Sequence, residues 1–405
     1  MNTIKENLLL FLFLCLATSC GSKNSSEELS SEVSNYKLAI TDSVQVDIFG
    51  SSLSLVDVHS ESGDLLIIQP DPPKLWIVSQ EGKIKETWEK SGNGPDEIGS
   101  NLLSAEFFGE GVAMMGYMRL KIFDKNFRAI GSYKPGFDLQ GMVYMGYNHL
   151  LAFESGGDEQ LVTFFGGPQT EHHWDSQEFY NEYNVVDVIN PKLEGEIESE
   201  LGEAKNVFKP IGGFTEDSQF KKSGRSHMYI IPVFDVQGNE LIYAFDRDTV
   251  LFKRELPSGE LISSTPIPFD QFYLSKGWTM GKGVAEMNSG NVAPKNRRGN
   301  IERVFHSNGF DVIFYRSGLP LETIQAITLQ GAEKAREEYR LDYSKHLILK
   351  EGERINKDLK TTDKIYAPSI TDNSGFLWAR QNVNALDKEP DLVTFYKLKI
   401  VPDEN

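Results

Sequence analysis

The sequence predicts an all-β fold, a six-bladed β-propeller of four-stranded antiparallel blades. From Tyr36 onward, short runs of β-branched and aromatic residues alternate with Gly, Asp, Asn and Pro, about every eight to twelve residues. A unit made of a turn, an apolar strand, a break and a second apolar strand recurs six times. The chain has 405 residues, a length that a single propeller domain can reach.

The six units identify the expected blades. Leu75–Ser79 and Leu120–Asp124 begin 45 residues apart, an interval that suits one four-stranded blade. Extra length lies between the third and fourth units, and the stretch 166–236 is either a long loop or a hidden seventh blade. The units are Ser62–Val78, Gly109–Phe123, Asn148–Phe165, Asn239–Phe252, Asn308–Ile327 and Gly375–Phe395.

The two ends of the domain are expected to meet. A hairpin alone cannot bury its apolar faces, whereas blades stacked around an axis cover one another. An open ring would leave exposed strand edges. We therefore expect a strand near Tyr36–Ile48 to pair with the last strands, around Leu392–Val401, in a single domain that spans residues 36–401.

The first residues have the layout of a secretory signal. Leu8–Ala17 is a ten-residue apolar run that follows Lys5 and precedes the small residues Thr18 and Ser19. Such a run is too short to cross about 30 Å of hydrocarbon as a helix. We expect residues 1–19 to be a signal peptide and the polar residues 20–35 to be a flexible tether.

Leu16–Cys20 resembles the lipobox that lipoprotein-processing enzymes read, with Ala17 at the place where a branched aliphatic residue is usual. This resemblance implies that Cys20 carries the lipid, with palmitate-like chains that anchor the protein. Gly21 is not the Asp of inner-membrane retention, so we expect an outer-membrane lipoprotein that faces the periplasm or the cell surface. The alternative is ordinary secretion with an incidental cysteine. Cys15 is the other cysteine, so the processed chain could form no disulfide.

One motif resembles a known family. Ser91–Ile98 is similar to the G-x-G-P-x-E-[FY] motif of six-bladed, TolB-like β-propeller lipoproteins abundant in Bacteroidetes, and Gly92, Gly94, Pro95 and Glu97 match it. Ile98 replaces the aromatic residue. We expect the glycines to adopt positive φ in a structural turn between blades. The resemblance implies fold and location and says little about chemistry.

Composition and motifs argue against several functions. A formal net charge of −18 disfavours binding to nucleic acid. The sequence has no phosphate-binding loop, nucleophile elbow, zinc helix or calcium loop, so we expect no catalytic residue, metal or cofactor. Candidate ligand contacts lie in two polar stretches that would reach the rim of the ring. They are Arg225, His227, Trp278, Arg297 and Arg298.

Two functions remain. The first is a binding or interaction module that presents loops to a protein, peptide or glycan. The second is a hydrolase or lyase that acts on glycan or peptide in the axial cleft, with Arg225, His227 and acidic residues as acid or base groups. A cluster of His, Arg and carboxylate at one mouth of the ring would favour the enzyme, and a scattered arrangement would favour binding.

Overall fold

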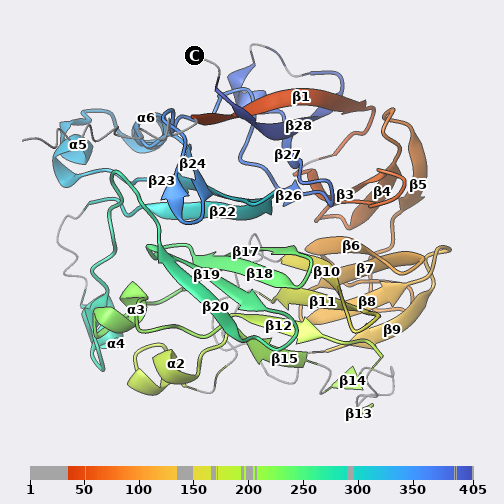
Figure 1. The fold of residues 1–405 in the computed structure, drawn as a ribbon, viewed down its shortest axis with the longest axis horizontal. Helices are drawn as coiled ribbons and strands as arrows, with labels where there is room; N and C mark the ends of the chain where they lie inside the picture. The colour runs from red at the N-terminus through yellow and green to blue at the C-terminus, as the bar shows by residue number, and fades with distance from the viewer. Residues whose placement is uncertain are drawn as a thin grey trace, which may run out of the picture.

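The computed structural model describes residues 35–50, 52–134, 149–165, 170, 172–192, 196–197, 204–205, 208–289, 296–386, 388 and 390–403. Six blades, each with four antiparallel strands, follow one another around a ring, and the chain colour runs around it from red through green to blue (Figure 1). The predicted six-bladed propeller with four-stranded blades is confirmed.

The first three blades follow in sequence order. Blade one contains β2 (Ser54–Val58), β3 (Leu65–Gln69), β4 (Lys74–Val78) and β5 (Ile84–Trp88). Blade two contains β6 (Ser104–Phe108), β7 (Gly111–Gly116), β8 (Arg119–Phe123) and β9 (Ala129–Tyr133). The short strands β13 (Glu196–Ile197) and β14 (Ala204–Lys205) extend its sheet beyond β9. Blade three contains β10 (His149–Ser155), β11 (Asp158–Phe164), β12 (Val186–Ile189) and β15 (Phe208–Ile211).

The remaining blades complete the ring. Blade four contains β17 (Pro232–Gln237), β18 (Glu240–Phe245), β19 (Val250–Glu255) and β20 (Leu261–Pro266). Blade five contains β22 (Asn300–Ser307), β23 (Phe310–Arg316), β24 (Lys345–Lys350) and β25 (Glu353–Arg354). Blade six contains β26 (Ile370–Thr371), β27 (Leu377–Arg380), β28 (Val393–Pro402) and β1 (Tyr36–Val46).

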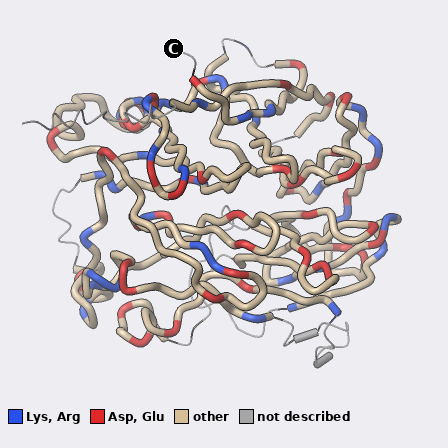
Figure 2. The backbone as a smooth tube through the Cα atoms, viewed as in Figure 1, with Lys and Arg blue, Asp and Glu red and all other residues tan. Residues whose placement is uncertain are grey.

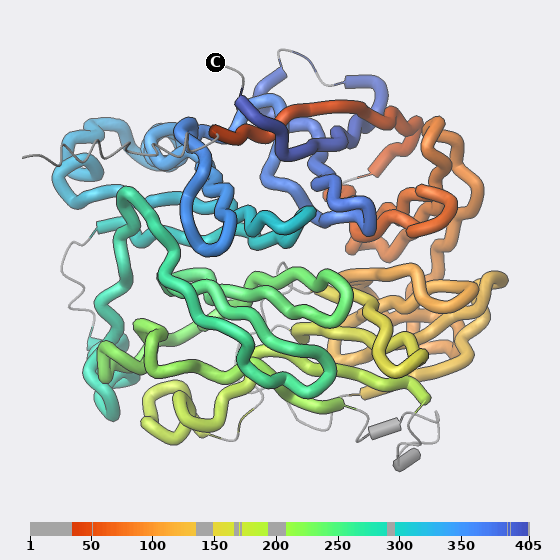
Figure 3. The backbone as a smooth tube through the Cα atoms, viewed as in Figure 1, coloured from red at the N-terminus to blue at the C-terminus, as the bar shows by residue number. Residues whose placement is uncertain are grey.

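Ring closure joins the two ends of the domain as expected. β1 is the outermost strand of blade six and pairs with β28 from Tyr36 opposite Pro402 to Val46 opposite Val393. The red first strand therefore lies against the blue last strand (Figure 3). The first strands of the blades, β2, β6, β10, β17, β22 and β26, contact one another in that order and surround the axis.

The core lies between the blades as six separate apolar clusters, one at each junction. Each blade packs on both faces, so successive residues of a strand are buried on opposite sides. In β3, Leu65 and Ile67 pack toward blade six, whereas Leu66 and Ile68 pack toward blade two. This explains why such strands are continuous apolar runs without alternation.

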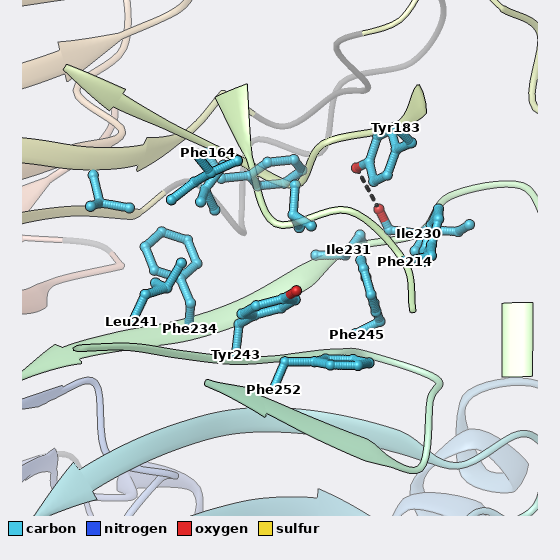
Figure 4. Packing of buried hydrophobic residues seen from close by; sticks show 14 of the residues in the cluster. Phe164, Tyr183, Phe214, Ile230, Ile231, Phe234, Leu241, Tyr243, Phe245 and Phe252 are labelled. Atoms are coloured by element: carbon cyan, nitrogen blue, oxygen red, sulfur yellow. Dashed lines mark hydrogen bonds between the residues drawn. The ribbon is translucent and has the colours of Figure 1, made fainter. Parts of the chain in front are cut away.

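The long stretch 166–236 does not add a seventh blade in its described part. It supplies the outer strands β12 and β15 of blade three, together with α2 (Gln177–Glu182), α3 (Gln219–Lys222) and β16 (Arg225–Ser226). Aromatic side chains of this stretch join the largest junction cluster, where Tyr183 and Phe214 pack near Tyr243 and Phe245 of blade four (Figure 4).

One expected unit is partly wrong. Asn308–Ile327 was expected to hold two strands, but only its first half is a strand, β23, and Leu321–Ala326 forms helix α5. Pro320 lies directly before this helix, where its missing N–H costs no helical hydrogen bond. The third strand of the blade follows only after helix α6 (Gly331–Leu341), at β24.

Loops leave the two ends of the ring unequally. Antiparallel neighbours run in opposite directions, so the connections between second and third strands and those between blades emerge on the same face. This insertion face carries α2, α3, α5, α6, β16, β21 (Trp278–Thr279), α4 (Gly283–Asn288) and the short 3-10 helix η2 (Val383–Ala385). No helix in the described ranges is long and apolar enough to cross a membrane.

Candidate functional site

Three of the predicted ligand contacts meet on the insertion face. β16 pairs antiparallel with β21, which sets Arg225 opposite Thr279 and Ser226 opposite Trp278. The Trp278 ring lies 5.6 Å from the ring of Trp174, which comes from the blade three insertion. The two polar stretches, about fifty residues apart in sequence, thus form one small structure with a third loop.

His227 lies inside this structure. Its side chain is 1% exposed, and its backbone N–H donates to the Tyr180 hydroxyl at 2.5 Å. Burial, with Arg247 and Arg225 nearby, lowers the pKa of His227 to about 4, so the imidazole is neutral near pH 7. A Cβ at Gly277 would lie 2.6 Å from the His227 ring, so the loop closes tightly over it.

Arg297 belongs to a different set of contacts. The Arg297 guanidinium is 3.8 Å from the carboxylate of Glu338 and 3.7 Å from that of Asp342, both in or next to α6. Arg298 is close enough to Asp246 to favour its ionised form, although burial still raises the Asp246 pKa. Asp246 also pairs with Arg247 at 3.0 Å, and Arg247 helps to lower the His227 pKa, so Arg298 adjoins the His227 group whereas Arg297 pairs with acids at α6.

The axis holds a set of carboxylates that join successive blades. The carboxylate of Asp57 accepts from the backbone N–H of Phe107 at 2.8 Å, and that of Glu106 accepts from Ala152 at 3.0 Å. The Asp235 carboxylate accepts from the backbone N–H of His306 at 3.0 Å. In each case an inner strand of one blade binds the inner strand of the next, so these acids have a structural use.

Burial raises the pKa of these acids. The pKa of Asp57 rises to about 6 and that of Asp235 to about 7. Burial and the nearby Asp57 carboxylate raise the pKa of Glu106 well above its ordinary value, and its second carboxylate oxygen has no hydrogen-bond partner among the described residues. Within the described ranges, no group of three His, Cys, Asp or Glu residues is placed to hold a metal ion.

The turn Gly92–Pro95 is held by a buried amine. Lys121, 5% exposed, donates to the carbonyl oxygens of Gly94, Pro95 and Glu97 at 2.8 to 3.0 Å. Gly92 has φ of 133°, as expected for a glycine turn, but Gly94 does not adopt positive φ, so that expectation is wrong. Gly94 is constrained by space instead, because a Cβ there would lie 2.9 Å from Glu97 Oε2.

A cleft of about 900 Å³ lies on the insertion face between blades five and six, a size typical of ligand sites. We call it the blade five–six cleft. Its walls come from β22, the end of β23, α6 and the segment between β25 and β26. It is lined by Asn300, Glu302, Arg303, Arg316, Tyr339, Arg340, Leu341, Tyr343, Ser344, Lys360, Thr361, Thr362, Asp363, Ile365, Tyr366, Ala367 and Asn382.

One wall of the cleft is fixed by interlocking contacts. The Arg316 guanidinium donates to Glu302 Oε1 at 2.8 Å and lies 3.9 Å from the centre of the Tyr339 ring. Glu302 Oε2 also accepts from the Ser344 hydroxyl at 2.7 Å. Arg316 therefore orients both a carboxylate and an aromatic ring before any ligand arrives.

The sequence did not reveal this cleft. The segments 300–303, 339–344 and 360–367 are far apart in the chain and contain no recognisable motif. Basic and acidic residues are interspersed over the whole backbone, so the distribution of charge does not mark the cleft either (Figure 2). The available signal was the adjacent pair Tyr339 and Arg340 at the end of α6.

Comparison with known proteins supports the fold. A member of the DUF4221 family from Bacteroides vulgatus matches with a TM-score of 0.58 at 13% identity, over 91% of this chain and 99% of that one. A Bacteroides fragilis protein assumed to be exported matches with a TM-score of 0.48 at 10% identity, over 90% of this chain and 95% of that one. No family model and no curated protein matches the sequence.

Proposed function

We propose that this protein is an exported, lipid-anchored binding module that takes its ligand, a protein, peptide or glycan, into the blade five–six cleft. The observation that carries the proposal is the combination of tyrosines, charged groups and a pre-oriented Arg316 in a cleft of about 900 Å³. Tyr and Arg are the residues that most often dominate binding sites. The lining contains no histidine or cysteine.

The alternative is a hydrolase or lyase with Arg225 and His227 as acid and base groups. It has less support, because His227 is almost fully buried, and a pKa of about 4 makes its imidazole both a rarely protonated acid and a weak base near neutral pH. Arg297 pairs with Glu338 and Asp342 instead of joining the His227 group, so one of the expected groups is not available there.

Location is the second part of the proposal. The apolar run Leu8–Ala17 and the lipobox-like Leu16–Cys20 support export and a lipid at Cys20, in the outer membrane and facing the periplasm or the surface. The resemblance to TolB-like propeller lipoproteins agrees with this location. Residues 1–34 lie outside the described ranges, so Cys20 and the proposed tether are argued from sequence alone.

Replacement of the anchor cysteine tests the location. Cys20→Ala should move the protein from the membrane to the soluble fraction without changing its melting temperature, because the lipid supplies the membrane affinity and the propeller supplies the fold. Fractionation followed by immunoblotting measures the shift, and Cys15→Ala is the matched control. A Cys20→Ala protein that stays bound to membranes would contradict the lipid anchor.

Replacement of a cleft tyrosine tests the binding site. On arrays of glycans and peptides, the wild-type protein should bind ligands that the Tyr343→Ala variant does not bind. The reason is that Tyr343 lines the cleft and is 39% exposed. Tyr117→Ala is the control, since Tyr117 is exposed on the β7–β8 turn of blade two. Equal binding by all three proteins would show that ligands bind elsewhere.

A further inference from the structure

We infer that the ligand of the blade five–six cleft is an anionic oligosaccharide, one that carries carboxylate or sulfate groups. This inference rests on the proposed binding function and assigns its ligand class. It is carried by the charge, the exposed rings and the hydrogen-bonding groups of the cleft.

The charge of the cleft is opposite to that of the whole protein. The full chain has a formal net charge of −18, whereas the cleft is lined by four cationic and two anionic side chains. An anionic ligand is repelled by most of the surface and attracted to this cleft, which favours both selection and fast association.

Two of the cations are available to a ligand. Arg340 pairs with Glu337, and Lys360 pairs with Asp363, in each case three residues away along the chain. The side chains of Arg340 and Lys360 are 69% and 52% exposed, so a ligand anion can reach both cations. The exposed Lys360–Asp363 pair contributes little stability, whereas Glu337 accepts from Arg340 through both carboxylate oxygens and is the stronger competitor. Arg316, in contrast, is 12% exposed and positions the Tyr339 ring.

The rings suit a sugar. Tyr339 and Tyr343 are 56% and 39% exposed although they line a concave site. An aromatic ring with a hydroxyl offers a flat apolar face and a polar edge, which matches the apolar face and the hydroxyls of a sugar ring. Arg316 lies over Tyr339 at 3.9 Å and makes that ring a fixed platform.

The remaining lining favours a saccharide over a peptide. Hydroxyl and amide side chains outnumber aliphatic ones, which are only Leu341, Ile365 and Ala367. A peptide would need apolar pockets for anchoring side chains. A saccharide instead needs many donors and acceptors around its hydroxyl groups, and Asn300, Ser344 and Thr362 supply them.

Calorimetric titration with defined probes tests the inference. The probes are a short oligogalacturonate, a sulfated galactan oligosaccharide, a neutral galactan oligosaccharide and a short glutamate peptide. We expect one or both anionic saccharides to bind, the neutral one to bind at least about tenfold more weakly, and binding to weaken as salt is raised. The two anionic probes distinguish carboxylate from sulfate.

Variants assign the binding to the cleft. Lys360→Ala and Arg340→Ala should each lower the affinity for the anionic probe by roughly tenfold, and Tyr343→Ala should lower the affinity for both anionic and neutral saccharides. Lys192→Ala is the matched control, because Lys192 forms an exposed pair with Asp158 in another blade. Melting temperatures of all variants check that they fold.

The outcomes separate the two proposals. Stronger binding of the neutral saccharide or the peptide, lost in Tyr343→Ala, would overturn the ligand class and leave the binding site intact. If Lys192→Ala weakens binding of the anionic saccharide as much as Lys360→Ala does, the cleft is not the binding site. Failure of both anionic saccharides to bind would overturn the inference.

Discussion

A single buried lysine shows how one residue holds the junction between blades one and two. Lys121 lies on β8, and its amine donates to three carbonyl oxygens of the turn that leads from β5 to β6. A buried ammonium group is costly unless its donors are satisfied, and here each of these bonds satisfies a donor and an acceptor together. The glycine-rich turn is therefore bound from within by the protein itself.

Lys121→Met should lower the free energy of unfolding by about 2 to 4 kcal/mol, because three turn carbonyls would lose their donor. Thermal and urea unfolding measure the loss. Lys125→Met is the control, since Lys125 is exposed on the next turn of the same blade and should change stability by less than about 0.5 kcal/mol. Equal stability of the two variants would contradict the structural role of Lys121.

At the scale of elements, strand β28 joins the beginning and the end of the domain. It pairs with β27 on one side and with β1 on the other. Phe395 and Leu398 of β28 are buried in two different junction clusters, one toward blade one and one toward blade five. Blade six thus depends on two segments that lie more than 300 residues apart.

Deletion of Leu392–Asn405 should open the ring, separate β1 from its sheet and expose apolar edges. The loss of stability should far exceed the roughly 1 kcal/mol of a typical point mutation, and the protein should aggregate. Size-exclusion chromatography and thermal melting measure both effects. A chain that lacks only Glu404 and Asn405 is the control. A soluble, monomeric and equally heat-resistant long deletion would show that the blades do not form one cooperative unit.

At the scale of the whole molecule, buried titratable groups give the fold an uneven response to pH. The acids Asp57 and Asp235 have raised pKa values of about 6 and 7, so the folded state holds their protons more tightly than the unfolded chain does. Burial lowers the pKa of His149 to about 3 and that of His346 to about 4, so there the unfolded chain binds protons more tightly.

Below about pH 6.5, the two acids and the two histidines change the free energy of unfolding in opposite directions as pH rises. The acids lose their contribution to stability as pH rises from their unfolded pKa of about 4 through their folded pKa. The histidines lose theirs as pH falls below their unfolded pKa of about 6.5. The two effects offset each other between about pH 4 and 6.5, and above that range only the acids remain.

The free energy of unfolding should therefore fall as pH rises from about 6.5 to about 8.5, and Asp235→Asn should reduce that fall by roughly 0.8 kcal/mol. The amide oxygen of Asn can still accept from His306 but carries no charge. Urea unfolding at several pH values measures the slope, with the exposed Asp391→Asn as the control. An unchanged slope in Asp235→Asn would contradict the raised pKa.

The sequence by itself determined the all-β class, the six repeated units and the closure of the ring by its two ends. Strand propensity, turn residues and repeat spacing are local signals, and they can be read without knowledge of distant contacts. The same local signals failed at Leu321–Ala326, where a helix replaced an expected strand, and at Gly94, whose constraint comes from the side chain of Glu97.

Only the tertiary structure decided where the candidate site lies. The lining of the blade five–six cleft comes from five separate stretches of chain, which become neighbours only when blades five and six pack together. Burial also decided the protonation state of His227. Its sequence context is a polar loop, but the fold buries its ring against that of Phe220. Distance and burial are properties of the folded ring, and no local pattern of residues encodes them.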